Sequence, residues 1–477
     1  MNLIKFKSDW LLIAVLAVIT LGVYYNSLWG DFIIDDYSAI VINDNVHNIK
    51  NYFSNNFSVK VGILADVEHL FIWSIFGANP FYFHLFNVLV HLCCVILFFI
   101  LCNILFGKRE LSFLTSLIFA VHPIHTEAVS WIAGGHYALS SLFFIASLIF
   151  YIKSDKSLVN LSLAIIFFCL CFLAGYAAAV LPVMFLLYDI FFREKREGDK
   201  LAKLRILLLC FVFLIAIIFV LRLYWERNKF VHLIFYFRGF RFLIVAAKAF
   251  VYYLKILYMP LQRGLYHPFA FDTFKIQKIT PAFLLAIIIF VVSIAAFFRF
   301  RKSSKPLAFG IMWFYVTYIQ YSNIIPICNI ISERYIYLAS FGFSIILACL
   351  FLKIWEIINK EVKHRYILRA LAIAVIVLFV GSYASLTMKR NYDYHDIMIY
   401  WQSNINNFKE GYIVYNNLAG TFYAMGDKGN AIAYCWITLM VDPAQPHVWY
   451  NLGKVYKEIG ELKQAEDCFI NALIVDK

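Results

Sequence analysis

Apolar and polar positions alternate along this chain in long blocks. Runs of about 20 apolar residues, the length that crosses a hydrocarbon core, recur as far as residue 387. They predict an all-α, polytopic membrane helical bundle. The predicted spans number about eleven and lie near residues 10–28, 84–106, 111–132, 138–152, 158–174, 177–192, 206–223, 282–298, 307–321, 335–352 and 367–387.

A different pattern begins after Lys389 and Arg390, where the chain becomes polar with a helical period. Five positions recur 34 residues later, and 34 residues is the period of a tetratricopeptide repeat, a helix-turn-helix unit. The recurring pairs are Tyr415 and Trp449, Leu418 and Leu452, Phe422 and Tyr456, Gly426 and Gly460, and Ala431 and Ala465. We therefore expect a membrane domain over 1–390 and a tetratricopeptide-repeat helical solenoid over 391–477, with repeats near 412–445 and 446–477.

Composition and charge give this bundle an orientation. The chain is 63% hydrophobic and only 15% charged, and its net charge is +13. If the N-terminus is cytoplasmic, half of the 42 Lys and Arg residues fall in short inner loops, as the positive-inside rule requires. The first loop, roughly 29–83, and the repeat domain then lie outside. This predicts either a bacterial inner-membrane protein with a periplasmic repeat domain or an endoplasmic-reticulum protein with a lumenal one.

One apolar stretch, 243–261, does not fit as a span, because counting it would move the basic run 299–305 to the outer side. We expect it to lie in or dip into the outer interface, as basic amphipathic helices do. It belongs to a strongly basic segment, 222–281, which suits either anionic lipid headgroups or a lipid-linked phosphate donor. Arg263 and His267 of this segment are candidate ligands for the phosphate.

Two polar clusters interrupt the apolar pattern at outer ends of predicted spans. His122, His125 and Glu127 form the first, but they lack the H-E-x-x-H spacing of a zinc site. We expect a hydrogen-bonded network there and no metal or other cofactor. The second cluster lies at 332–338 and contains Glu333 and Arg334. Arg334 suits bidentate contact with a phosphate. The alternative is a structural ion pair of Arg334 with Glu333 or another carboxylate.

The strongest candidate for chemistry is the acidic pair Asp35 and Asp36, just beyond the first predicted span. Ionisable groups at a membrane boundary are expensive and are usually functional. A turn or helix cap is the structural alternative for this pair. The ten cysteines are scattered, mostly within spans, and indicate no disulfide framework.

These stretches together resemble the transmembrane and tetratricopeptide-repeat O-mannosyltransferase family, including its prokaryotic relatives. The resemblance covers essentially the whole chain, in order, and rests on the stretches 32–36, 122–132, 181–189, 322–326, 332–338 and 390–396 followed by the repeats. It implies a GT-C fold and transfer of a sugar, possibly mannose, from a polyprenyl-phosphate donor to a protein hydroxyl on the outer side. It also implies that Asp35 is the catalytic base, with Asp36 orienting the base or the acceptor.

Three stretches depart from the family's pattern. Where members usually carry Tyr-Arg-Pro in the first external loop, this chain has 60–64 without that motif. Where they carry Gly-Arg-x-Asp/Glu, it has Gly134-Gly135-His136-Tyr137. Where they carry Lys-Glu, it has Gly175-Tyr176. Three charged motifs are therefore missing together, which indicates either altered donor or acceptor choice or a catalytically inactive protein.

We therefore expect a membrane glycosyltransferase whose catalytic residues are Asp35 and Asp36. Arg334, Arg263 and His267 are the expected donor-phosphate ligands. The expected site-supporting residues are His122, His125, Glu127 and Glu333. The expected partners are membrane lipid, a lipid-linked sugar and a protein bound by the repeats, with no nucleic acid. The alternative is a decayed GT-C body that serves as a membrane-anchored repeat scaffold; a transporter is a weaker third reading, because no charged pair lies within a span.

Overall fold

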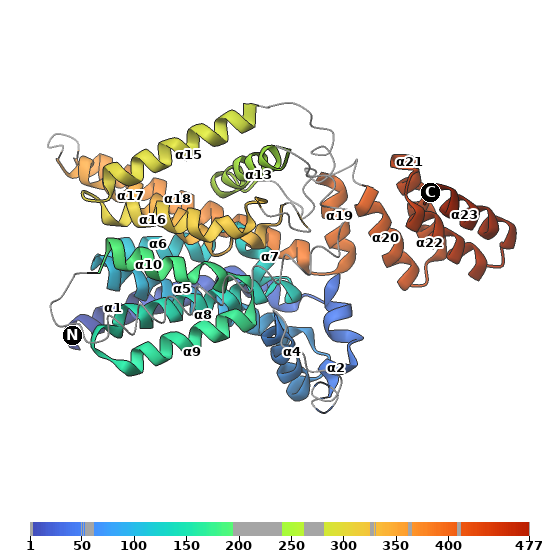
Figure 1. Cartoon of the computed structure of the whole chain (residues 1–477), viewed down its shortest axis with the longest axis horizontal. Coiled ribbons are helices and arrows are strands. Elements are labelled where there is room, and N and C mark those ends of the chain that lie inside the picture. Colours follow the sequence, from blue (N-terminus) through green and yellow to red (C-terminus); the bar gives the residue numbers. More distant parts are fainter. Residues whose placement is uncertain are drawn as a thin grey trace. The chain divides into compact units, whose positions relative to one another are not determined.

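The computed structural model of this chain describes residues 3–48, 50, 52, 62–193, 241–261, 281–324, 329, 331–360, 365–407 and 412–476. Over these residues every regular element is a helix, and no strand occurs. This confirms the all-α class. The described residues divide into two compact units, the first ending at Asn391 and the second beginning at Tyr392. Figure 1 shows the long helices α5, α8 and α9 of the first unit side by side.

The first unit is built from helices of very different lengths. Its longer helices are α1 (Leu3–Tyr24), α4 (Ile63–Phe76), α5 (Pro80–Phe106), α6 (Arg109–Val121), α8 (His136–Ile152), α9 (Leu158–Ala174), α10 (Leu181–Phe191), α13 (Arg241–Tyr258), α15 (Pro281–Phe300), α16 (Lys305–Tyr318), α17 (Ala339–Lys360) and α18 (Arg365–Asn391). Its short helical pieces are η1 (Tyr25–Trp29), η2 (Tyr37–Val41), α2 (Asp44–His47), η3 (Pro123–His125), α7 (Thr126–Val129), η4 (Ile132–Gly134), η5 (Lys153–Lys156), η6 (Tyr176–Val180), η8 (Ile319–Tyr321) and η9 (Glu333–Ile336).

Six helical stretches in the described residues are long and apolar enough to cross a membrane. They are Asp9–Trp29, Pro80–Phe106, Ile132–Asp155, Pro281–Phe300, Ala339–Lys360 and Tyr366–Tyr394, and each coincides with a predicted span. The predicted spans 158–174 and 177–192 form shorter apolar helices. The span predicted near 307–321 forms α16, of 14 residues, and the one near 206–223 lies outside the described residues. The count of eleven is therefore not confirmed.

The span expected over 111–132 is not one continuous helix. Helix α6 ends at Val121 after 13 residues, and η3, α7 and η4 follow as separate short pieces. Pro123 explains the break, because proline has no N–H for the helical ladder and disfavours a helical conformation in the residue before it. His122 accordingly has an extended backbone, with ψ of 124°. The result is an irregular polar segment, 122–135, between α6 and α8.

The core of the first unit lies where α5, α16 and α17 meet. Phe98 and Phe341 stack with ring centroids 3.4 Å apart, and the Trp313 indole donates a hydrogen bond to the Leu338 carbonyl at 2.8 Å. Close approach of α16 and α17 depends on glycine, because a Cβ on Gly342 would lie 2.6 Å from a main-chain oxygen of α16. Small residues at helix crossings commonly serve this purpose in membrane bundles.

Helix α13 forms in the stretch for which we expected an interfacial helix, and it is not among the six candidate spans. It packs against α15 and buries one face, including Ala249, Tyr253 and Leu257. The helix is therefore amphipathic and attached to the bundle through its apolar face. Its position at a membrane surface stays a prediction.

The second unit begins with η10 (Tyr392–Tyr394) and α19 (Ile397–Asn407) and continues as two helix-turn-helix repeats. The repeats consist of α20 (Tyr412–Ala424), α21 (Lys428–Val441), α22 (Pro446–Glu458) and α23 (Leu462–Val475). Gly426 and Gly460 lie in the two turns with φ of +81° and +87°, a conformation that favours glycine. Gly453 lets α22 and α23 approach, since a Cβ there would lie 2.7 Å from the Phe469 ring. The helices thus follow the predicted 34-residue period.

Candidate active site

The irregular segment between α6 and α8 is the centre of the candidate site. Its path requires two glycines, because a Cβ on Gly134 would lie 2.1 Å from the Glu127 carbonyl oxygen and one on Gly135 would lie 2.0 Å from Asn87 Oδ1. The Asn87 amide, from α5, donates hydrogen bonds to the carbonyls of Trp131 at 3.3 Å and Ile132 at 3.1 Å. This segment is therefore pinned to α5 and presents its remaining polar groups to neighbouring loops.

The stretch that follows η1 is attached to this segment by Asp36. The carboxylate is fully buried and accepts hydrogen bonds from the backbone N–H of Ile33 at 3.0 Å and of Ala133 at 2.8 Å. Burial raises the pKa of Asp36 to about 7, although these hydrogen bonds and others oppose the shift. Each carboxylate oxygen accepts a hydrogen bond from one main-chain N–H, and Asp36 therefore fixes the loop against the segment.

Asp35 differs from its neighbour, since it is exposed. The residue before it, Ile34, has φ of +50°, a left-handed conformation that is unfavourable for a β-branched side chain. Such strain persists where the surrounding structure enforces it, and it clusters at functional sites. The two acids of the predicted pair therefore lie in different environments: Asp36 anchors the loop, and Asp35 is open to solvent.

Glu127 and Arg334 form the second element of the site. Glu127 is 2% exposed, and its carboxylate is paired with the Arg334 guanidinium. The same carboxylate accepts hydrogen bonds from Ser332 Oγ at 2.6 Å and from the backbone N–H of Arg334 at 2.9 Å. Of the two alternatives for Arg334, the structure contains the ion pair, and the partner is Glu127 rather than Glu333.

Three aromatic rings surround the Arg334 guanidinium. Its carbon lies 5.0 Å from the Trp131 ring centre, 5.6 Å from that of Tyr137 and 5.3 Å from that of Tyr335. Contacts of this kind are attractive, because the electron-rich face of the ring meets a cation. Residue-by-residue reading of the sequence missed these rings; aromatic residues make up 19% of the chain, so none of them stands out.

The other site-supporting residues lie in buried networks beside this pair. His122 Nε2 interacts with the Leu257 carbonyl at 3.1 Å, and His125 Nε2 with Ser340 Oγ at 2.7 Å. Glu333 is 1% exposed and is paired with Arg390 of α18, a partner that the sequence reading did not identify. Within the described ranges, no group of His, Cys, Asp or Glu is arranged to hold a metal ion. The expectation that no metal takes part stays a prediction.

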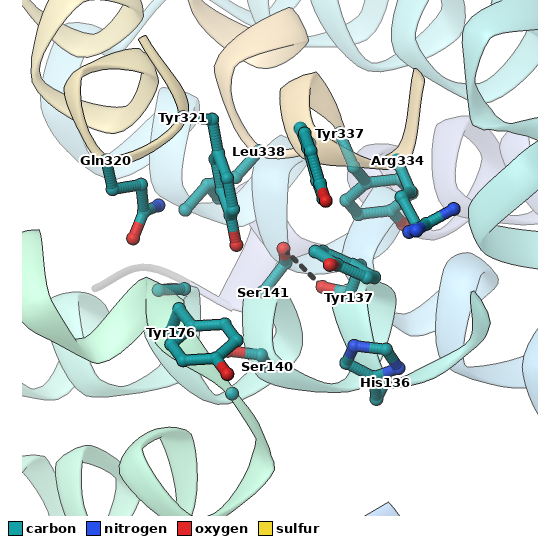
Figure 2. Close-up of a pocket in the computed structure, with 13 residues that line it drawn as sticks. His136, Tyr137, Ser140, Ser141, Tyr176, Gln320, Tyr321, Arg334, Tyr337 and Leu338 are labelled. Carbon is teal, nitrogen blue, oxygen red and sulfur yellow. Dashed lines mark hydrogen bonds between the residues drawn. The ribbon is translucent and has the colours of Figure 1, made fainter. Parts of the chain in front are cut away.

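A pocket lies between α8, η6, η8 and η9, and Figure 2 shows its lining. Arg334 and four tyrosines, Tyr137, Tyr176, Tyr321 and Tyr335, contribute to it, together with His136, Ser140 and Gln320. The Tyr321 and Tyr335 rings stack 4.7 Å apart. The free volume is about 10 Å³, close to what one water needs. A larger ligand therefore requires these side chains to move apart.

Comparison with known proteins shows which proteins this chain resembles. A family model described as tetratricopeptide repeat matches residues 446–476. Protein O-mannosyl-transferase TMTC3 of Mus musculus is 25% identical over 98% of this chain and 55% of the relative. Protein O-mannosyl-transferase F38B6.6 of Caenorhabditis elegans is 24% identical over 97% of this chain and 62% of the relative. The chain resembles the TMTC proteins along almost its whole length.

A shorter and closer match adds to this. Protein O-mannosyl-transferase TMTC1 of Homo sapiens is 37% identical over 30% of this chain and 18% of the relative. The chain spans about half the length of the TMTC3 proteins that it matches. No solved structure matches the chain.

Two of the three departures from the TMTC pattern line the same pocket. Gly135 and Tyr137 stand at the charged positions of Gly-Arg-x-Asp/Glu, and Gly175 and Tyr176 stand at those of Lys-Glu. Of these residues, Tyr137, Gly175 and Tyr176 contribute to the pocket beside Arg334. The third departure, 60–64, lies only partly within the described residues. Arg263 and His267 lie outside them. The pocket is therefore lined in part by positions at which the TMTC pattern has charge and this chain has none.

Proposed function

We propose that this protein is a membrane glycosyltransferase that moves a sugar from a polyprenyl-phosphate donor to a protein hydroxyl on the extracytoplasmic side. The resemblance to proteins named O-mannosyl-transferases supports transfer of mannose. One observation carries the proposal: a single short segment binds both candidate groups. Its Ala133 N–H binds Asp36, next to the exposed acid, and its Trp131 ring contacts the Arg334 guanidinium.

In the proposed reaction, Asp35 takes the proton of the acceptor hydroxyl. The hydroxyl oxygen then forms a bond to C1 of the sugar, and the bond between C1 and the phosphate oxygen breaks. The lipid phosphate leaves with that electron pair, so its charge increases as the bond breaks. A fixed cation at this position stabilises the transition state more than the bound donor, and Arg334 is our candidate, with Arg263 and His267 as the further phosphate ligands.

The aromatic surroundings of Arg334 suit this role. Glu127 neutralises the guanidinium in the resting protein, so a buried cation does not stand alone. The planar group keeps further N–H donors for an incoming phosphate, because a guanidinium carries five. The rings on three sides limit the directions from which an anion approaches.

The repeat unit supports a protein as the acceptor. A pocket of about 110 Å³ lies between its helices, lined among others by Asn416, Tyr423, Asn451 and Lys454. Side-chain amides pair with the N–H and C=O groups of an extended peptide, and Lys454 adds a positive charge. Stacked helical repeats generally present such surfaces to partners. We therefore propose that the repeats hold the acceptor protein.

Sugar transfer from a panel of polyprenyl-phosphate sugars tests the proposal, with wild type compared with Asp35→Asn. Loss of a general base should lower the rate by about 10²- to 10⁴-fold. Asp31→Asn is the matched control, because Asp31 is also exposed and lies in the same loop. Equal transfer by wild type and Asp35→Asn would reject the base. A wild type that neither transfers a sugar nor binds any lipid-phosphate sugar would instead favour the scaffold alternative.

A further inference from the structure

His136 begins α8 and contributes to the pocket beside Arg334. Its Nδ1 lies 2.9 Å from the Ala133 carbonyl oxygen. A carbonyl can only accept a hydrogen bond, so Nδ1 must carry the proton. In the neutral ring, Nε2 is then left with a lone pair and acts as a hydrogen-bond acceptor. The backbone of the irregular segment therefore selects one tautomer of this histidine.

No partner for Nε2 exists among the residues that the structure describes. His136 is partly exposed, and Figure 2 shows its ring beside Tyr137 in the pocket lining. His69 of α4 lies close enough to interact electrostatically with His136, and burial together with that interaction lowers the pKa of His69 to about 4. His69 Nδ1 is buried without a hydrogen-bond partner in the described residues. His69 is therefore a neutral imidazole near His136 and supplies no charge for a phosphate.

The distance to Arg334 indicates which part of a donor this acceptor would meet. The His136 and Tyr137 ring centres are 4.2 Å apart, and the Arg334 guanidinium carbon is 5.6 Å from the Tyr137 ring centre. The His136 ring and the guanidinium are therefore less than 10 Å apart. If the phosphate binds Arg334, the sugar attached to it lies within reach of His136.

We propose that His136 Nε2 accepts a hydrogen bond from a hydroxyl group of the donor sugar, and so makes this pocket the sugar-binding part of the site. The inference rests on the proposed function and adds a ligand class for a residue that lies between two positions at which the TMTC pattern has charge. The two groups are complementary, since a sugar hydroxyl can donate a hydrogen bond and the unprotonated nitrogen of a neutral imidazole accepts one. The tyrosines around it provide rings and hydroxyls of the kind that a sugar contacts.

Two substitutions test the roles of the two ring nitrogens separately. In His136→Asn the amide nitrogen takes the place of Nδ1, so the bond to Ala133 is kept and the pocket-facing acceptor is lost. In His136→Gln the longer side chain carries a polar amide to the place of Nε2. The measurement is binding to the detergent-solubilised full chain of two probes, polyprenyl-phosphate mannose and polyprenyl phosphate without a sugar.

We expect His136→Asn to weaken binding of the sugar-bearing probe by about 3- to 10-fold, the value of one hydrogen bond, and to leave binding of bare polyprenyl phosphate unchanged. His136→Gln should recover part of the loss. The exposed His447 of the repeat unit gives the control His447→Asn, which should bind both probes as wild type does.

Other results overturn the inference in distinguishable ways. Equal weakening of both probes would make His136 a phosphate contact or a purely structural residue. Unchanged binding of both probes with a lower kcat and a changed pH profile would make it a base for the acceptor instead. If wild type itself binds neither probe, the proposed function fails, and the inference fails with it.

Discussion

Replacing Glu127 by Gln tests whether the Arg334 ion pair organises the site. The side chains are nearly closed off from solvent, with exposures of 3% for Glu127 and 14% for Arg334. Glu127 satisfies three donors, from Ser332 Oγ, the Arg334 backbone and its guanidinium. Gln keeps one acceptor oxygen and leaves the guanidinium without a counter-charge. Removing one partner of a buried pair costs about 3–5 kcal/mol, and we expect a loss of unfolding free energy in that range.

Chemical denaturation in detergent measures this change. The matched control is Glu356→Gln, because Glu356 pairs with Lys353 at 2.9 Å on the surface, with exposures of 58% and 63%, and exposed pairs contribute little. The double variant Glu127→Gln with Arg334→Gln should be less destabilised than the single variant, since no unpaired charge remains. If Glu127→Gln unfolds as easily as the Glu356 control and no more, the pair does not hold the site together, and our account of Arg334 is wrong.

Two further predictions concern the loop that contains Asp36 and the orientation of the chain. The folded protein keeps a proton on Asp36 up to about pH 7, whereas the unfolded chain releases it near 3.8. Stability should therefore fall as pH rises from about 4 to 7, by up to roughly 4 kcal/mol, and Asp36→Asn should flatten this slope. Glu68, whose pKa burial raises to about 8, contributes with the same sign, so Glu68→Gln should flatten only the remainder; a slope unchanged in Asp36→Asn would refute the assignment. For orientation, a cysteine placed at Gln445 should react with a membrane-impermeant thiol reagent from the extracytoplasmic side, and labelling from the cytoplasmic side would reverse the proposed topology.

Local sequence patterns predicted the periodic parts of the fold. The 34-residue repeat predicted the helices α20–α23, because each repeat forms its helices and turn from contacts close in sequence. Hydropathy identified six of the spans for a similar reason. A run of about 20 apolar residues predicts a spanning helix by itself, without knowledge of its packing partners. It failed over 111–132, where apolar content continues past Val121 but Pro123 ends the helical ladder. The apolar content of a stretch does not register that one proline ends the helix within it.

Residue types in the sequence selected the acids and the cation of the candidate site but did not show which of them pair. Glu127 and Arg334 are 207 residues apart in sequence, and Glu333 and Arg390 are 57 apart. A single sequence contains no signal that joins such partners, so an adjacent pairing of Glu333 with Arg334 was as reasonable as the one observed. The same limit applies to Asp36, whose role depends on the N–H of Ala133, 97 residues away. Residue type indicated polar chemistry, and the tertiary fold decided which groups meet.

The charges that this chain lacks relative to the TMTC pattern are missing as pairs, and the pocket gives a physical reason. A lone charge left in a closed, aromatic-lined space would be costly, whereas replacing both partners of a buried pair by packed uncharged groups is often nearly neutral. The departures at Gly135–Tyr137 and at Gly175–Tyr176 follow this rule, since the uncharged side chains of Tyr137 and Tyr176 line the space together with His136. Arg334 is the exception and keeps its own carboxylate partner, Glu127. Breaking the Glu127–Arg334 pair would leave a buried charge without its partner, at a cost of about 3–5 kcal/mol, which is a physical reason for its presence beside positions where the charges of the TMTC pattern are absent.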